Sequence, residues 1–221
     1  MQGGMLRGIL ATIDFGETRL RANDPCSPQS SDRVTSEEWD SRKSSGMNQF
    51  RPKAIQAASQ FFGTRKELKL LGWGMSGFVF LSPDRTSAVK IHHYDEGFAT
   101  ELQAYRNLRK FGVTNVHGFS VPKPRSYRPD LKAICMDCVV SPFLLDFAGV
   151  HFEPPDYSDD VWEHWHSEVE LRFGPNSHLA FAVYGSLQQY GIWYTDLRQS
   201  NLNLDGHPEA KAFPTDESDA P

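Results

Sequence analysis

Three short segments of this chain carry residue types that can handle phosphate, and the first is rich in glycine. It reads Gly72-Trp73-Gly74-Met75-Ser76-Gly77-Phe78-Val79. Glycine has no Cβ atom, so backbone N–H groups in such a loop can approach phosphate oxygens. Dinucleotide-binding folds use the same spacing, but there the loop leads into a helix. Here an apolar and aromatic strand follows, so we expect a strand-strand hairpin. Taken alone, the run fits an ordinary hairpin equally well.

The second segment is Ala88-Val89-Lys90-Ile91, on the next expected strand. A lysine in mid-strand beside apolar neighbours needs a partner for its charge. Phosphate oxygens are one such partner, and Glu101 in the following helix is another, with Glu96 as its alternative. An ion pair between Lys90 and Glu101 would aim the ammonium at the α- and β-phosphates of a nucleotide. The competing interpretation is an edge-strand lysine that points to water.

The third segment is Tyr194-Thr195-Asp196-Leu197-Arg198-Gln199-Ser200-Asn201, after a long expected helix. In phosphoryl transfer, an aspartate can accept the proton of the attacking hydroxyl, and an asparagine in the same loop can hold a divalent cation. We assign these roles to Asp196 and Asn201, and we expect Arg198 to neutralise charge on the transferring phosphate. A capped turn would use the same two residue types, so this spacing is common by itself.

The elements expected around these segments follow an α+β order. Helices are predicted at 52–62, 97–111, 158–172 and 177–190, and strands at 68–71, 78–81, 87–92, about 120–127 and 131–139. A terminal hairpin is predicted from 202–204 and 210–213, with its turn at Asp205-Gly206. Strands and helices do not alternate, which argues against a doubly wound parallel sheet. The polar stretch 1–48 is expected to be disordered.

Together, these segments resemble the protein kinase-like superfamily over about residues 66–216, specifically bacterial kinase-like proteins with a truncated C-terminal lobe. The resemblance implies a two-lobe fold. Residues 49–140 would form the nucleotide-binding N-lobe, with a five-stranded antiparallel sheet and one helix. Residues 141–221 would form a reduced, mainly helical C-lobe that ends in the short hairpin.

The resemblance also implies cofactors and contacts. ATP and Mg²⁺ would be bound, and Ile134-Cys135-Met136-Asp137-Cys138-Val139 would be the hinge between the lobes. The Asp137 carbonyl and the Val139 N–H would hold the adenine edge, with Met136 at the rear of the pocket. The expected catalytic residues are Asp196, Lys90 and Arg198. The expected cofactor-binding residues are Gly72, Gly74, Gly77, Val79, Ala88, Lys90, Glu101, Met136, Asp137 and Val139.

The chain departs from the family pattern in several respects. Tyr194 and Thr195 stand where the family has His and Arg before the catalytic Asp, and the metal-binding Asp-Phe-Gly motif is absent. The expected metal ligands are therefore Asn201 and Asp216, which follows the hairpin. Few residues come after Asp216, so the helices that would support the catalytic loop are missing. Asp146 is expected either to bond a ribose hydroxyl or to cap a turn.

The predicted function is transfer of the ATP γ-phosphate to a hydroxyl of a protein Ser/Thr residue or a small molecule. One alternative is a catalytically weak pseudokinase-like module that binds nucleotide or a partner. Another is a fragment of a longer kinase.

Charge, apolar runs and the positions of the Cys and His residues argue against several classes of protein and site. The net charge of −5, without a basic stripe, argues against nucleic-acid binding. No apolar run reaches the roughly 18 residues of a membrane helix. Cys135 and Cys138 lie in an apolar strand without a second pair, so we expect neither a zinc nor a redox site. His92 and His93 should point to opposite faces of their strand and not share a metal. These features predict a soluble cytoplasmic protein.

Overall fold

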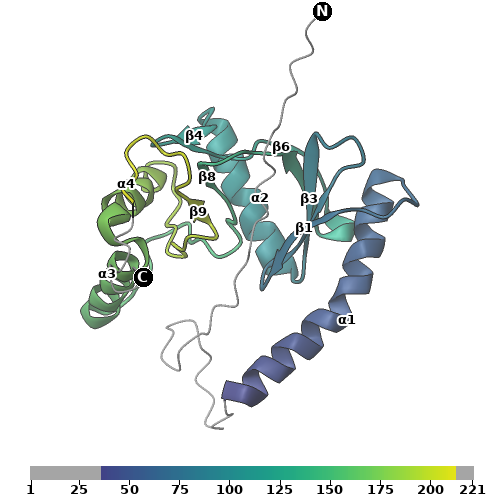
Figure 1. Cartoon of the computed structure of the whole chain (residues 1–221), viewed down its shortest axis with the longest axis horizontal. Helices are drawn as coiled ribbons and strands as arrows, with labels where there is room; N and C mark the ends of the chain where they lie inside the picture. The colour runs from purple at the N-terminus through teal and green to yellow at the C-terminus, as the bar shows by residue number, and fades with distance from the viewer. Residues whose placement is uncertain (1–35, 213–221) are drawn as a thin grey trace, which may run out of the picture.

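The computed structural model describes the backbone of residues 36–212 and the side chains of residues 49–212 (Figure 1). The predicted metal ligand Asp216 and most of the N-terminal extension lie outside these residues. Helix α1 (Ser36–Phe62) begins well before the expected start at residue 52. The backbone of residues 36–48 is helical, and the disorder expected for the N-terminal extension stays a prediction.

A five-stranded antiparallel sheet occupies the first half of the chain, and it confirms the predicted sheet. Its strand order is β1-β2-β3-β7-β6. The bounds are β1 (Leu70–Gly74), β2 (Gly77–Leu81), β3 (Ser87–His92), β6 (Pro124–Arg128) and β7 (Ala133–Asp137). The predicted strand near 120–127 is displaced, because residues 119–120 belong to a different sheet and β6 begins at Pro124.

The sheet presents two different faces because successive side chains of a strand alternate. One face packs Phe78, Phe80, Val89 and Ile91 against Ala54 and Ala58 of α1. Directly paired residues share a face, and Val79 pairs with Lys90 while Ala88 pairs with Met136. The second face therefore carries four of the predicted nucleotide-contacting residues side by side.

Helix α2 (Asp95–Lys110) follows β3 and contacts both β3 and β7. Phe98, Leu102, Tyr105 and Leu108 recur at helical spacing and are all buried. Acidic residues begin the helix and Arg109 and Lys110 end it, which suits the helix dipole. The predicted helix 97–111 is confirmed within two residues at each end.

A second sheet of two-residue strands connects distant parts of the chain. Its order is β4-β5-β8-β9, from β4 (Asn115–Val116), β5 (Phe119–Ser120), β8 (Phe143–Leu144) and β9 (Leu202–Asn203). Strand β8 runs parallel to β5 and antiparallel to β9. This pairing places residues 143–147 beside the loop that ends at Asn201.

The predicted terminal hairpin is wrong. Strand β9 pairs with β8, and no strand is present at residues 210–212. The side chain of Asn176 instead holds the backbone of Lys211: Nδ2 donates to its carbonyl at 2.9 Å, and its N–H donates to Oδ1 at 2.7 Å. That segment therefore bonds to the start of a helix and not to β9.

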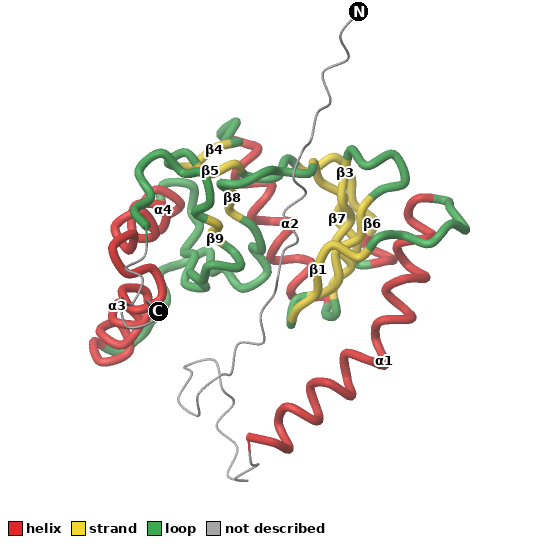
Figure 2. The backbone as a smooth tube through the Cα atoms, viewed as in Figure 1, coloured by secondary structure: helices red, strands yellow, loops and turns green. Residues whose placement is uncertain are grey.

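Helices α3 (Asp159–Phe173) and α4 (Ser177–Gln188) confirm the two helices predicted in the second half. A 3₁₀ turn (Gly174–Asn176) joins them, and another (Pro129–Leu131) precedes β7. In Figures 1 and 2, α3 and α4 lie on the opposite side of the molecule from α1, with both sheets and α2 between them. The fold class is α+β, as expected.

Candidate functional site

Lys90 is the centre of a buried ion-pair network. Its Nζ donates to Glu101 Oε2 at 2.6 Å and to Asp146 Oδ1 at 2.8 Å, and only 6% of its side chain is exposed. The predicted ion pair with Glu101 is present, and the alternative partner Glu96 is exposed. Burial opposes the charged amine, but the Asp146 and Glu101 carboxylates outweigh it and raise the pKa of Lys90. A lysine that points to water is therefore excluded.

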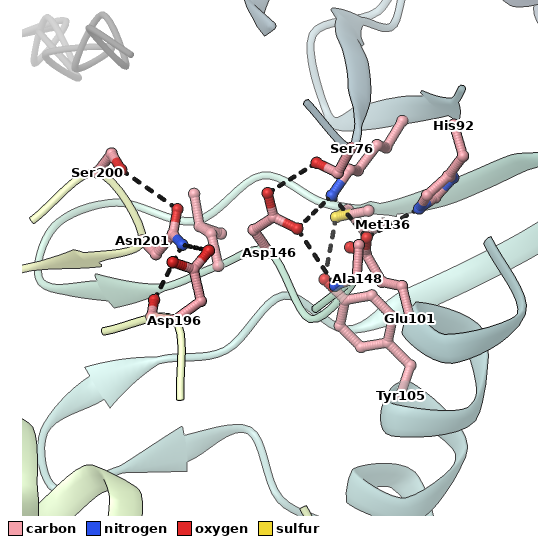
Figure 3. A network of polar contacts seen from close by, with 12 residues as sticks. Ser76, His92, Glu101, Tyr105, Met136, Asp146, Ala148, Asp196, Ser200 and Asn201 are labelled. Carbon is pink, nitrogen blue, oxygen red and sulfur yellow. Dashed lines mark hydrogen bonds and ion pairs between the residues drawn. The ribbon is translucent and has the colours of Figure 1, made fainter. Parts of the chain in front are cut away.

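Asp146 joins this network from the loop after β8 (Figure 3). Its Oδ2 accepts the Ser76 hydroxyl at 2.8 Å, and its Oδ1 also accepts the Ala148 N–H at 3.2 Å. The Ala148 bond is the turn cap that the sequence suggested. Burial acts to raise the pKa of Asp146, but the Lys90 ammonium prevails and lowers it to about 2. Asp146 is thus a carboxylate at neutral pH.

The backbone at Asp146 has an unusual conformation. Its φ of 57° lies in the left-handed region, which Asp tolerates better than most residues. The next residue, Phe147, is fully buried, with its ring centroid 5.4 Å from that of Tyr105 and 5.5 Å from that of Tyr194. Phe147 therefore anchors Asp146 between α2 and the loop that follows α4.

The glycine-rich run forms the predicted hairpin. Gly72 pairs with Val79 and Gly74 pairs with Gly77, so Met75 and Ser76 form a two-residue tip. Gly77 cannot carry a side chain, because a Cβ atom there would lie 2.2 Å from the Ile91 carbonyl oxygen. The tip hydroxyl of Ser76 bonds to Asp146, so the hairpin closes over the Lys90 network.

The loop of Asp196 and Asn201 lies on the other side of Asp146 from this hairpin (Figure 3). Asn201 Nδ2 donates to the Asp196 carbonyl at 3.2 Å and to Oδ2 at 3.0 Å. Arg198 Nε donates to Asp196 Oδ1 at 2.5 Å. Burial raises the pKa of Asp196, and Arg198 opposes this only in part. A raised pKa makes this carboxylate a stronger proton acceptor.

Helix α3 supports this loop from one side. Trp165 Nε1 donates to the Thr195 carbonyl at 2.7 Å, and Arg172 Nη1 donates to the Leu197 carbonyl at 3.4 Å. Gln199 Nε2 in turn donates to the Arg172 carbonyl at 2.7 Å. The sequence suggested that the loop lacks supporting helices, but its backbone is held by a helix earlier in the chain.

Backbone bonds fix Asp146 relative to Asn201. The Leu145 N–H donates to the Asn201 carbonyl at 2.7 Å, and the Leu145 carbonyl accepts the Tyr194 hydroxyl at 2.5 Å. Tyr194 is fully buried and occupies the position where the family pattern has His. These bonds bring together the Asp146 carboxylate and the Asn201 amide, which are 55 positions apart in the chain.

The remaining predicted nucleotide contacts lie at the end of β7. Met136 is buried and accepts a bond from the Tyr105 hydroxyl, with the oxygen 3.4 Å from Sδ. The Asp137 N–H donates to the Lys123 carbonyl at 2.9 Å, and its carboxylate pairs with Arg125. Val139 follows the strand and is half-buried.

Asp146 is the residue whose main contact the sequence reasoning missed. Its signal was present in Asp146-Phe147-Ala148-Gly149, which has a Phe after the Asp and a Gly two residues later. The family pattern places its Asp-Phe-Gly motif after the residue that corresponds to Asn201, whereas this segment precedes Asn201. Because this segment precedes Asn201 in the chain, its position beside the Asp196 loop becomes visible only through β8–β9 pairing.

Other features of the described residues do not add to this site. No three His, Cys, Asp or Glu side chains among residues 49–212 converge as a metal-binding group. Cys135 is buried and Cys138 is exposed, and both are free thiols. A cavity of about 400 Å³ lies between α2 and β6, lined in part by Arg106, Arg109 and Arg125, and none of the predicted site residues lines it.

Compared with known proteins, the chain matches no family profile, no curated protein and no solved structure. Within the described part of the chain, none of the helices is both long and apolar enough to cross a membrane.

Proposed function

We propose that this protein is an ATP- and Mg²⁺-dependent phosphotransferase with a protein kinase-like fold, which transfers the γ-phosphate to a hydroxyl group. The observation that carries the proposal is the buried Lys90–Glu101–Asp146 network under the glycine hairpin, with Asp196 and Asn201 beside it. A lysine held between two carboxylates beside a glycine-rich turn suits a phosphate site, because its charge is retained although it is buried.

The adenine end of the nucleotide is assigned to the sheet face that carries Val79, Ala88 and Met136. These side chains share one face with Lys90, so a nucleotide lying on it can reach the ammonium with its phosphates. The end of β7, at Asp137 and Val139, would bond the adenine edge. This assignment follows the resemblance together with the observed register.

The residues present fit a magnesium ion. Mg²⁺ in nucleotide sites takes one or two protein ligands and completes its shell with phosphates and water. Asp146 and Asn201 supply a carboxylate and an amide from adjacent segments, and we assign them as the ligands in place of the Asp216 pairing. Bound Mg²⁺ would neutralise phosphate charge during transfer.

Asp146-Phe147-Ala148-Gly149 supports the same assignment. It resembles the Asp-Phe-Gly motif with one additional residue, and the Asp is the metal-binding member of that motif. In this chain the motif would stand before the catalytic loop. Asp196 would accept the proton of the attacking hydroxyl, for which its raised pKa is suited.

A second candidate function is a nucleotide-binding module with weak or no turnover. The observation that favours it is the Arg198–Asp196 ion pair, which reduces the availability of Asp196 as a base. The two functions share the nucleotide site and differ only in phosphate transfer.

The first test is ligand-induced thermal stabilisation. Saturation at about 100 times Kd stabilises a protein by about 2.7 kcal/mol, which for this size raises Tm by about 5–10 °C. We expect such a shift with MgATP, and its loss in Lys90→Met and Asp146→Asn. The exposed Lys66→Met is the matched control and should keep the shift.

Lys90→Met leaves two buried carboxylates without their partner, so this variant is destabilised. The second measurement is therefore isothermal titration of MgATP into each folded variant at low temperature. Unaltered MgATP affinity in both site variants, or no binding by the wild-type chain at millimolar ATP, would refute the nucleotide site. Formation of ADP from ATP distinguishes the two candidates, because transfer of the γ-phosphate to a hydroxyl leaves ADP as the other product. Wild-type turnover that Asp196→Asn abolishes supports the enzyme, and equal rates support the binding module.

A further inference from the structure

The cavity between α2 and the edge strand β6 has the size and the walls of a small-molecule site. Its volume is about 400 Å³. Pockets that bind small molecules begin at about 300 Å³, so this volume suits a compact ligand. Leu102 and Tyr105 of α2 and Pro124 of β6 provide apolar walls, and Tyr127 adds an aromatic ring. These walls favour a ligand with an apolar or aromatic body.

The wall formed by α2 is fixed by the core behind it. Tyr105 is 1% exposed, and its hydroxyl oxygen lies 3.4 Å from Met136 Sδ. Leu102 is buried beside it, and both side chains belong to the main buried cluster. Because close-packed core side chains are held in place, a ligand would meet a preformed surface and little ordering would oppose its binding.

The charged lining of the cavity is entirely cationic. Arg106, Arg109 and Arg125 line it, and none of its lining residues in the described part of the chain is an Asp or a Glu. This contrasts with the net charge of −5 of the whole chain. Arg125 pairs with Asp137 and donates to the Thr86 hydroxyl and carbonyl, each at 3.0 Å. The charge of Arg125 is therefore already balanced.

Arg106 and Arg109 are the two cations of the lining that lack a carboxylate partner. Within residues 49–212, neither forms an ion pair. They are three positions apart on α2 and so are neighbours on one face, where like charges repel. Arg106 lies over the Tyr127 ring, with Cζ 5.6 Å from the centroid and Nη2 3.4 Å from the hydroxyl oxygen. Its guanidinium is thus held at the aromatic wall, and a bound anion would relieve the repulsion.

We propose that this cavity binds a small organic phosphate, whose apolar or aromatic body lies against Leu102, Tyr105 and Tyr127. A phosphate ester carries nearly two negative charges at neutral pH and has three acceptor oxygens. It matches two guanidinium groups, each of which can donate two parallel N–H bonds. The hydroxyls of Ser126 and Tyr127 can donate to a remaining oxygen. A carboxylate, with one charge, would leave one of the two cations unbalanced.

This site is separate from the proposed function, because its lining shares no residue with the Lys90–Glu101–Asp146 network. The ligand would therefore bind whether or not the network holds a nucleotide.

Phenyl phosphate is the probe, because it joins a phosphate ester to an aromatic ring. Isothermal titration into the full chain at pH 8, where the ester is fully ionised, should show one site with a Kd of about 0.1–1 mM. Inorganic phosphate and phenol, the two halves of the probe, should each bind about tenfold more weakly or less tightly still. Equal affinity for inorganic phosphate would overturn the role of the apolar walls. Absence of binding at about 10 mM phenyl phosphate would overturn the site.

Variants of the full chain locate the bound probe. Arg106→Gln and Arg109→Gln each remove one cation from an exposed side chain, so both should fold, and each should raise Kd about tenfold. Arg51→Gln, equally exposed on α1, is the matched control and should leave Kd unchanged. Unchanged Kd in both cavity variants would overturn the assignment.

Asp146→Asn distinguishes this cavity from the proposed nucleotide site. It should leave the Kd of phenyl phosphate unchanged, and a changed Kd would place the probe in the Lys90 network and overturn the cavity assignment. The MgATP experiments decide the proposed function independently, because neither Arg106 nor Arg109 belongs to that network.

Discussion

Asp146 connects two parts of the site at the residue scale. One carboxylate oxygen accepts the Lys90 ammonium and the other accepts the Ser76 hydroxyl. Such charge-assisted bonds stabilise the ionised form, and removing one partner leaves a buried charge without compensation. The same carboxylate would hold a cation, so its position governs both folding and the proposed chemistry.

The first prediction concerns acid stability. The pKa of Asp146 is lowered from an ordinary 3.8 to about 2, so its contribution is complete above pH 3.8 and is lost as pH falls through about 2. The stability advantage of wild type over Asp146→Asn should shrink by about 1.5 kcal/mol between pH 5 and pH 2.5. Urea unfolding at each pH measures it.

The control for this prediction is Asp95→Asn. The Asp95 side chain is 88% exposed, so this substitution should leave the pH profile of stability unchanged. A constant difference between wild type and Asp146→Asn across the range would contradict the lowered pKa.

The second prediction concerns Asp196 as the proposed base. Burial raises the pKa of Asp196, and Arg198 opposes the shift. On the proposed function, formation of ADP from ATP should fall as pH drops through this pKa, because only the carboxylate accepts a proton. Arg198→Gln should move that acidic limb to higher pH, and the exposed Arg109→Gln should not. An identical limb in wild type and Arg198→Gln would show that Asp196 does not control the rate.

Part of the candidate site could be predicted from residue types alone. Lys90 needs a carboxylate because it lies among apolar neighbours, and Glu101 is the acidic residue on the buried side of the next helix. Asp196 and Asn201 are local to one loop. Asp146 could not be assigned in this way, because its partners come from a hairpin and strand that only the tertiary fold brings together.

At the scale of elements, the glycine hairpin depends on one close approach. A Cβ atom on Gly77 would meet the Ile91 carbonyl oxygen, whereas one on Gly74 would have open space. Our third prediction is that Gly77→Ala lowers the free energy of unfolding by about 3 kcal/mol, and Gly74→Ala by about 1 kcal/mol or less. Chemical denaturation of both variants tests this, and equal costs would contradict it.

The long elements were predictable from periodicity, and the short ones were not. Helices α2, α3 and α4 repeat apolar residues at helical spacing over several turns, so their signal is strong. The strands β8 and β9 have two residues each, too few for alternation to be visible. The terminal hairpin failed because a distant Asn176 bonds to the segment that was expected to pair.

At the scale of the whole molecule, one core crosses from the five-stranded sheet to the helices of the second half. One buried cluster contains Ile134 and Met136 of β7, Tyr105 of α2, Phe147 of the loop after β8, and Val183 of α4. A domain boundary near residue 140 therefore does not divide the packing. The molecule should unfold as one cooperative unit.

The fourth prediction tests this shared core by hydrogen exchange. Phe147→Ala should reduce the protection of amides in both β3 and α4 by the same amount, about 3–5 kcal/mol, because one opening exposes both. Leu171→Ala, at a side chain that is 75% exposed, should alter neither. Loss of protection in α4 alone would indicate two independent units.

The double attachment of Leu145 has a consequence for control of the protein. Its N–H and its carbonyl are both bonded to the segment 194–201, so Asp146 cannot swing away while that segment keeps its shape. A switch that displaces Asp146, the proposed metal ligand, would therefore have to break both of these bonds. The Ser76–Asp146 bond, by contrast, is a single side-chain contact from a two-residue tip. On the proposed function, regulation would therefore act on the hairpin tip above the nucleotide site, and not on the position of Asp146.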